Sequence, residues 1–182
     1  MKGLVFTEFL EMVENRFGIT MTDKIIQGAK LSSGAAYTSV GDYDHLELVA
    51  LVLQLNAETK IPVPDLLRVF GKDLFGRFVA GYPQLFKSGQ TAFGFLQNIE
   101  SYIHSEVRKL YPIAELPTFE CRETQQCLIM IYRSQRPFAD LAEGLIAGCI
   151  EHFGEALDLS HEDLSGNAGT SARFTITRRG MA

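Results

Sequence analysis

Residues 91–111 read TAFGFLQNIESYIHSEVRKLY and contain a single histidine, His104. Thr91 can cap the start of a helix in this stretch, and Pro112 ends it. Because His104 lies beside an apolar stripe, a neutral imidazole there could be a metal ligand that faces a cavity. A hydrogen-bonded core histidine is the alternative, and this stretch alone leaves both interpretations open. The stripe recurs at steps of three and four residues, the spacing of an amphipathic helix, through Phe95, Leu96, Ile99, Ile103, Val107 and Leu110.

Upstream of this stretch the sequence predicts helices and little strand. Asp44 and Glu47, three residues apart, have the pattern of a capping box at the start of a helix. Glycines inside the last upstream helix predict a break or a kink at Gly71 and Gly76. Apolar residues at helical spacing mark four segments, at residues 2–17, 22–30, 45–59 and 64–82.

Downstream of Pro112 the pattern changes to strands and one helix. Helices followed by an antiparallel sheet indicate an α+β fold, with an N-terminal helical subdomain packed on a C-terminal subdomain of antiparallel sheet plus helices. We expect one domain over residues 1–182, divided into subdomains of about residues 1–65 and 66–182 with a cleft between them. The predicted strands lie at about residues 118–122, 126–133, 156–160 and 173–177, and the predicted helix lies at residues 138–153.

Length and composition limit the classes of partner. The chain has 182 residues, is 46% hydrophobic and carries a formal net charge of −5. One domain of this size can enclose a ligand, and the acidic balance argues against nucleic acid or an acidic membrane surface as a partner. No apolar run approaches the roughly 20 residues that a membrane span needs, and the N-terminus lacks a signal-peptide pattern. We therefore expect a soluble, cytoplasmic protein without membrane insertion and, by default, a monomer.

Three polar side chains follow one another at the end of a predicted strand. Tyr132, Ser134 and Arg136 alternate along the chain, so their side chains are expected to point to one face. Arginine gives a charged, bidentate clamp for a carboxylate or phosphate, and the two hydroxyls can donate to the remaining lone pairs. The pattern predicts an anion site, and an exposed strand end with ordinary polar residues is the alternative.

Several separated motifs together resemble the H-NOX (haem–nitric oxide/oxygen binding) family. They are the opening MKGLVFTEF, the helical histidine, the Tyr-Pro and Leu-Pro pairs that follow it, and the Tyr-x-Ser-x-Arg spacing. The resemblance covers nearly the whole chain. It implies that haem b is buried between the two subdomains and that the chain is of the stand-alone bacterial NO-sensor type.

The resemblance assigns roles to the residues already singled out. In that family the histidine of the long helix is the proximal iron ligand, a role that falls here on His104. The Tyr-x-Ser-x-Arg motif binds the haem propionates, which implies that role for Tyr132, Ser134 and Arg136. Pro117 matches the proline that presses on the porphyrin and keeps it non-planar, although a proline there can also simply end the linker before a strand.

The resemblance also places four apolar residues on the side of the haem where a gas binds. Leu141 matches the position at which oxygen-binding members have a tyrosine. Bound dioxygen needs a hydrogen-bond donor, whereas NO and CO bind ferrous haem without one. Because all four residues are apolar, we expect the haem to bind NO and CO and to exclude O₂. The alternative is that the four residues only pack in the core. The four residues are Val5, Phe9, Leu74 and Leu141.

Some relatives carry a histidine-and-cysteine zinc site near the C-terminus. This chain retains His161, but the surrounding segment SHEDLSGNAGTSARF contains no cysteine. The thiols of Cys121, Cys127 and Cys149 lie elsewhere and form no CxxC pair. We expect this zinc site to be absent, the thiols to be reduced and structural, and His161 to be an ordinary surface or boundary residue.

The function that the resemblance implies is gas sensing without catalysis. NO binding would weaken the bond from His104 to iron and free its helix, and the signal would pass to a separate histidine kinase or cyclic-di-GMP enzyme. Two alternatives stay open. One is a haem-free ligand or interaction module that uses the same cavity. The other is an enzyme in which the face of Tyr132, Ser134 and Arg136 binds a substrate carboxylate and His104 is the general base.

Overall fold

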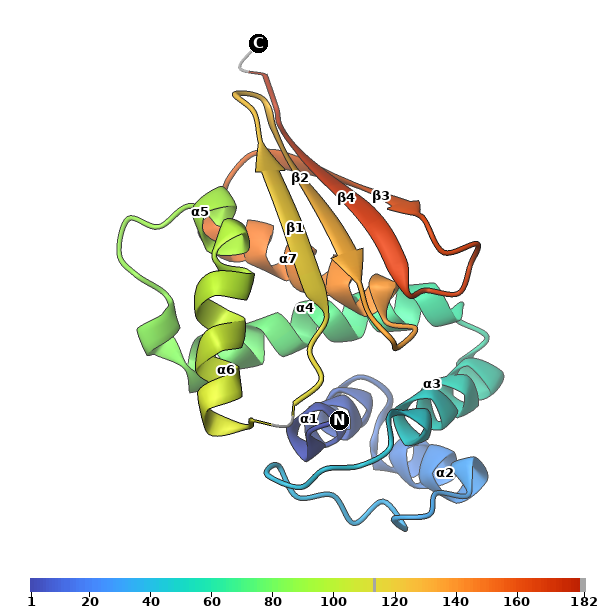
Figure 1. The fold of residues 1–182 in the computed structure, drawn as a ribbon. Helices are drawn as coiled ribbons and strands as arrows, with labels where there is room; N and C mark the ends of the chain where they lie inside the picture. The colour runs from blue at the N-terminus through green and yellow to red at the C-terminus, as the bar shows by residue number, and fades with distance from the viewer. Residues whose placement is uncertain (113, 181–182) are drawn as a thin grey trace.

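The computed structural model describes residues 1–112 and 114–180, and it combines seven α-helices with a four-stranded antiparallel sheet in the described part (Figure 1). The α+β prediction is therefore confirmed. The side chain of Leu110 and residues 113, 181 and 182 of the predicted domain lie outside the described part. The helices are α1 (Gly3–Phe17), α2 (Ile19–Ala29), α3 (His45–Thr59), α4 (Val63–Gly81), α5 (Ala92–Gln97), α6 (His104–Leu110) and α7 (Ala139–Phe153). The strands are β1 (Thr118–Glu123), β2 (Cys127–Arg133), β3 (Leu157–Asp163) and β4 (Ser171–Arg178).

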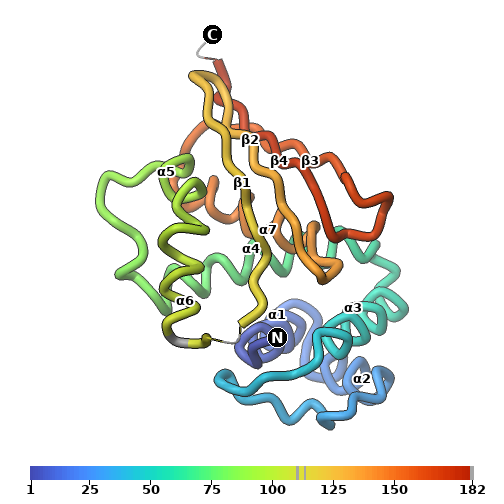
Figure 2. The backbone as a smooth tube through the Cα atoms, in the orientation of Figure 1, coloured from blue at the N-terminus to red at the C-terminus, as the bar shows by residue number. Residues whose placement is uncertain are grey.

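The three N-terminal helices gather at one end of the molecule, away from the sheet (Figure 1). Gly18 ends α1 at φ 86°, a backbone conformation that favours glycine, and α2 starts at the next residue. The connection between α2 and α3 runs along the outside of these helices (Figure 2). It is tied to the start of α1, where the amide of Gly3 donates to the Gly41 carbonyl over 2.8 Å. None of the described helices is both long enough and apolar enough to cross a membrane.

The sheet buries one of its faces against α7. Its strand order is β1-β2-β4-β3, and all neighbouring pairs are antiparallel. Alternate residues of the two central strands are buried, as a period of two requires when one face meets a core. From β2 and β4 these are Leu128, Met130, Tyr132, Ala172, Phe174 and Ile176, and α7 contributes Ala142, Ile146 and Cys149 to the same core.

Helices α4 and α7 approach each other closely through two glycines. A Cβ atom on Gly71 would overlap the carbonyl oxygen of Leu141, and one on Gly144 would overlap the carbonyl oxygen of Arg68. The helix α4 runs unbroken past Gly71 and Gly76, so the predicted break is wrong, and its alternative, a kink, stays a prediction. Packing of α4 against α7 outweighs the weak helix propensity of glycine, and Gly71 permits that close contact.

The described residues form two hydrophobic cores, and α4 contributes to both. The sheet-side core contains Phe75 of α4 together with the buried faces of β2, β4 and α7. The helical core contains Leu74 of α4 together with buried residues of α1, α2 and α3. Adjacent residues on α4 thus face different cores, since one helical step turns the side chain by about 100°. The predicted division at residue 65 stays a prediction.

The quoted stretch at residues 91–111 is helical, as predicted, but it is not one regular α-helix. Thr91 caps α5, since its Oγ1 accepts a hydrogen bond from the Gly94 amide over 3.0 Å. A π-helical turn, η2 (Ile99–Ile103), then separates α5 from α6, and α6 begins at His104. Residue spacing alone does not reveal such a turn, because the apolar stripe continues through it.

Candidate functional site

The imidazole of His104 lies at the first residue of α6 and is largely buried, with 8% of the residue exposed. Its Nδ1 atom lies 2.6 Å from Oε1 of Glu100, one helical turn earlier. Burial lowers the pKa of His104 below its ordinary value of 6.5, although the Glu100 carboxylate acts in the opposite direction. The ring is therefore neutral at pH 7. Nδ1 carries the proton that is donated to Glu100, and the lone pair of Nε2 is left as a metal donor.

An aromatic side chain joins His104 to the first residue of the predicted anion site. The Phe119 ring on β1 has its centroid 6.0 Å from that of His104 and 5.6 Å from that of Tyr132. Phe119 and Tyr132 are direct partners in the β1–β2 register. The Phe119 ring thus lies beside both His104 and Tyr132, although 28 positions separate these two residues in the sequence.

The phenol of Tyr132 is nearly inaccessible, with 2% of the residue exposed. Burial raises the pKa of Tyr132, while a hydrogen bond from Ser134 and the charge of Arg136 lower it less strongly. The phenol is consequently a proton donor at neutral pH. Ser134 and Arg136 both act on this phenol, and the anion site that the three residues would form stays a prediction.

The backbone that carries Tyr132, Ser134 and Arg136 differs from the predicted strand. Strand β2 ends at Arg133, so only Tyr132 lies within it. Ser134 makes one further pairing, from its amide to the Thr170 carbonyl over 2.8 Å, and then its Oγ accepts from the Arg136 amide over 3.0 Å. This side-chain turn, of the kind that serine forms with the amide two residues on, places Arg136, where the prediction had strand alternation.

A carboxylate of the chain itself is bound to Arg136. Nη2 of Arg136 lies 2.7 Å from Oε2 of Glu115, and Nη1 donates to the Glu115 carbonyl over 3.3 Å. The arginine side chain is only 16% exposed, whereas that of Glu115 is 70% exposed. The pairing shows that the position of this guanidinium suits a carboxylate, the group that a propionate would present. A bound propionate would have to share Arg136 with Glu115 or displace it.

The four residues expected on the gas side lie in the helical core. Val5 and Phe9 come from α1, Leu74 from α4 and Leu141 from α7. Phe9, Leu74 and Leu141 are buried, and Val5 is half-buried and packs against them. Tyr132 belongs to the other core. The predicted gas-side residues and the predicted anion-site residue are thus in separate cores of the described chain.

Pro117 directly precedes β1 and is half-buried. Two residues later in the chain comes Phe119, whose ring contacts both His104 and Tyr132. The position agrees with either predicted role, a contact to the porphyrin or the end of the linker before the strand, and the first role stays a prediction.

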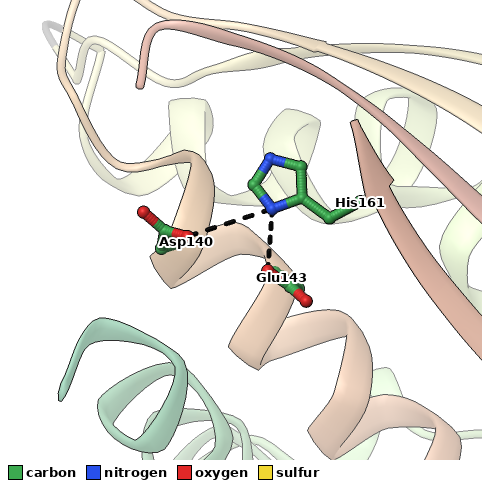
Figure 3. Close-up of side chains that lie close together, drawn as sticks. All are labelled: Asp140, Glu143 and His161. Atoms are coloured by element: carbon green, nitrogen blue, oxygen red, sulfur yellow. Dashed lines mark hydrogen bonds and ion pairs between the residues drawn. The ribbon is translucent and has the colours of Figure 1, made fainter. Parts of the chain in front are cut away.

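A second polar cluster surrounds His161 (Figure 3). Nδ1 of His161 on β3 lies 2.7 Å from Glu143 and 3.9 Å from Asp140, both on α7. Three ligand atoms are close enough there to hold a metal ion. Arg68 of α4 nevertheless occupies both carboxylates, with its Nε 2.7 Å from Glu143 and its Nη2 3.1 Å from Asp140. We interpret the cluster as a network of charges that joins three elements, since the guanidinium already compensates both acids.

The three cysteines are free. Burial raises the pKa of Cys121 to about 11 and also raises that of Cys149, so both thiols stay protonated at neutral pH. The buried Cys149 agrees with the prediction of a structural thiol, whereas Cys121 is an exposed residue and its structural role stays a prediction.

Sequence reasoning missed Glu100, Glu115 and Phe119. Glu100 precedes His104 by four residues, the helical spacing of a side-chain pair, and this signal was available. Phe119 is an apolar residue in a strand that follows Pro117, which was a weaker signal. Glu115 lies in a linker, and only the fold brings it to Arg136.

The donor set fits a haem group. A neutral, largely buried imidazole can ligate iron, and a guanidinium with two hydroxyl donors can hold carboxylates. The Phe119 ring beside His104 and Tyr132 suits an apolar macrocycle. These residues together meet both the iron and the propionate requirements of haem.

Comparisons with known proteins agree with a haem site. The family described as Haem-NO-binding matches residues 2–161. The chain is 39% identical to an H-NOX protein from K. algicida in the unliganded Fe(II) state, at a TM-score of 0.93, covering 99% of this chain and 97% of that chain. It is 42% identical to the IWP-051-bound H-NOX from Shewanella woodyi in the Fe(II)CO ligation state, at a TM-score of 0.82, covering 98% and 95% of the two chains.

A more distant structure shares the fold alone. The H-NOX protein from S. oneidensis in the Fe(II)NO ligation state is 23% identical, at a TM-score of 0.90 over 99% of this chain and 100% of that one. The collection of curated protein sequences contains no match. The family match over residues 2–161 and the identity to the K. algicida protein show that this chain belongs to the Haem-NO-binding, or H-NOX, family.

Proposed function

We propose that this protein is a haem-based gas sensor that binds NO and CO at ferrous haem, excludes O₂, and signals to a separate effector protein. The observation that carries the proposal is that the candidate iron ligand and the predicted anion site both pack against the ring of one residue, Phe119. The ring of Phe119 lies beside both His104, a neutral imidazole, and Tyr132, the buried end of the predicted anion site. This arrangement fits an iron ligand and a propionate site, and membership in the H-NOX family adds to its weight.

The chain's own residues divide the work of holding the cofactor. His104 would ligate the iron through Nε2, and Tyr132, Ser134 and Arg136 would bind the propionates, with Pro117 against the macrocycle. Bound haem would supply a ferrous iron that takes a diatomic gas. We propose haem b because the sequence has no CxxCH motif for covalent attachment.

The exclusion of O₂ rests on the apolar character of the four residues that we expect on the gas side. The side chains of Val5, Phe9, Leu74 and Leu141 are all hydrocarbon. The two tyrosines packed at the edge of this core use their hydroxyls elsewhere. Tyr37 donates to Glu47 over 2.7 Å, and Tyr43 donates to the Ala36 carbonyl over 3.1 Å. Partial negative charge on bound dioxygen would find no partner in this apolar set, whereas NO and CO need none.

A change at His104 would reach α6 first, because this helix begins at that residue. A signal requires a difference in interaction between two states, and release of His104 would supply one. The solved CO-bound relative is 42% identical, which favours CO as a ligand of this chain. A histidine kinase or a cyclic-di-GMP enzyme is the effector that we propose on the basis of the family resemblance.

The test is an anaerobic absorption spectrum of the reduced protein, recorded before and after NO is added and then, on a fresh reduced sample, in air. We expect a histidine-ligated ferrous haem, a spectrum typical of five-coordinate NO haem, and no stable spectrum of an O₂ complex. A stable O₂ complex would contradict the apolar pocket as the basis of selectivity. A colourless protein that takes up no added haem would contradict the sensor itself and favour the haem-free or enzyme alternative.

A further inference from the structure

Glu100 is the one side chain that hydrogen-bonds the imidazole of His104 in the described part of the chain. The distance from Glu100 Oε1 to His104 Nδ1 is 2.6 Å, within the range of a charge-assisted bond. The side chains are 30% and 11% exposed, so the pair is largely shielded from water. This contact is stronger and more directed than an exposed pair at the same helical spacing.

The backbone that positions this pair has an unusual conformation. Glu100 lies in the π turn η2, and the amide of His104 donates to the carbonyl of Ile99, five residues earlier. In an α-helix that amide would bond to Glu100 itself. A single π turn inside a helical segment is rare and occurs often at functional sites. Here it sets how the helix before His104 is rotated relative to the helix after it.

A third residue holds the far side of the Glu100 carboxylate. Nη2 of Arg108 lies 3.7 Å from Glu100 Oε2, and Arg108 follows His104 by one helical turn. The order along this face is a guanidinium, a carboxylate and an imidazole. The arginine faces Oε2, which leaves Oε1 of Glu100 to accept from the ring.

We propose that Glu100 is a positioning residue that sets the strength with which His104 holds the haem iron, and the proposal rests on the proposed function. A carboxylate that accepts from Nδ1–H fixes this tautomer, so that Nε2 is the metal donor. It also pulls the proton away from the ring and increases the electron density on Nε2. The bond from His104 to iron becomes stronger, and the reduction potential of the iron becomes lower. Glu100 thereby sets how readily gas binding releases His104.

The variant Glu100→Gln tests the charge alone, because glutamine has the same length and can still accept from Nδ1–H. In the reduced, haem-loaded protein we expect the iron–histidine stretching frequency to fall and the midpoint potential to rise. Glu100→Asp retains the charge and should restore part of both shifts. Glu106→Gln is the matched control. Glu106 lies in α6, the helix that begins at His104, but it pairs with Lys109 over 2.6 Å, so neither quantity should change.

A second measurement needs no haem. In the haem-free protein, ¹⁵N NMR of the His104 ring should show the Nδ1–H tautomer in the wild type. The ratio of that tautomer to the Nε2–H form should fall by about tenfold in Glu100→Gln, since bonds to charged acceptors are about twice as strong as neutral ones. Unchanged tautomers and an unchanged stretching frequency in Glu100→Gln would overturn the proposal. If the wild type binds no haem, the tautomer result still tests the Glu100 contact, while the proposed function fails separately.

Discussion

At the scale of single residues, Glu47 is the most constrained carboxylate of the described chain. It is 8% exposed and accepts from the hydroxyls of Ser32, Ser33 and Tyr37 and from the Ser33 amide. The capping-box prediction was correct for Asp44, which accepts from the Leu46 amide over 2.9 Å. It was wrong for Glu47, whose side chain reaches the loop between α2 and α3. The sequence pattern predicted correctly that the backbone of Glu47 is helical. It did not predict the partners of the side chain, which lie 10 to 15 residues earlier in the chain.

Glu47 should make the stability of the protein depend on acid. Burial alone would raise its pKa, but the hydrogen bonds from Ser32, Ser33 and Tyr37 outweigh burial and lower the pKa to about 2. A folded pKa below the ordinary value of 4.5 stabilises the fold above pH 4.5, and this contribution is lost as the pH falls toward 2. The contribution at pH 7 is about 3 kcal/mol.

The variant Glu47→Gln tests this by urea unfolding between pH 7 and pH 3. The amide NH₂ of the glutamine would face the hydroxyl and amide groups that donate to Glu47 in the wild type. We therefore expect the free energy of unfolding to fall by about 2–3 kcal/mol at pH 7 and to depend less on pH than in the wild type. Glu58→Gln is the control on the same helix, since Glu58 pairs only with the exposed Lys24. Parallel pH profiles for Glu47→Gln and the wild type would contradict the assignment.

At the scale of elements, the contact between α4 and α7 depends on glycine. Leu74 and Leu141, two of the residues proposed for the gas side, lie on these helices and owe their proximity to Gly71 and Gly144. Backbone atoms line the glycine positions, and backbone cannot move aside as a flexible side chain can. The helix–helix distance is thus fixed by the absence of two methyl groups.

Gly144→Ala should push the helices apart and destabilise the protein by about 1–3 kcal/mol. Gly76→Ala is the matched control in α4, because a Cβ atom there meets nothing within 4 Å. It should be neutral or stabilise the protein by up to about 1 kcal/mol, since alanine favours the helix. Urea unfolding measures both free energies. Equal losses in the two variants would show that helix propensity, not close packing, dominates at these sites.

At the scale of the whole molecule, Arg68 joins elements that are distant in the sequence. Its guanidinium contacts Asp65 on its own helix and Asp140 and Glu143 on α7, and Glu143 also contacts His161 on β3. The two α7 carboxylates are 22% and 18% exposed. Burial raises the pKa of Asp140, and Arg68 acts in the opposite direction. Removal of the arginine would leave two shielded acids beside each other.

Arg68→Met should lower the melting temperature and cost about 1–2 kcal/mol, a value between those of exposed and buried pairs because the Arg68 side chain is 39% exposed. Arg173→Met removes an exposed pair with Glu162 on the sheet surface and should cost less than about 0.5 kcal/mol. Thermal unfolding at low and high salt compares the two. Equal shifts in both variants would show that the Arg68 cluster contributes no more than a surface pair.

Much of the fold could be predicted because its signals are local. The Thr91 and Asp44 caps, the stop at Gly18 and the alternating burial of β2 follow from neighbouring residues and from the periods of helix and strand. The Tyr-x-Ser-x-Arg spacing and His104 pointed to an anion site and a metal ligand for the same reason, since each is a short pattern with a chemical meaning.

The remaining features depend on contacts between distant segments, which no local pattern reports. Sequence spacing made His104 a candidate ligand, but the fold brought the Phe119 ring beside both His104 and Tyr132, and it brought Glu115 to Arg136. The π turn before His104 arises in a stripe whose spacing also suits an ordinary helix. Sequence by itself determined which chemical groups are present and which local elements they occupy. Tertiary structure decided which of those groups meet, because burial and pairing energies are set by neighbours in space.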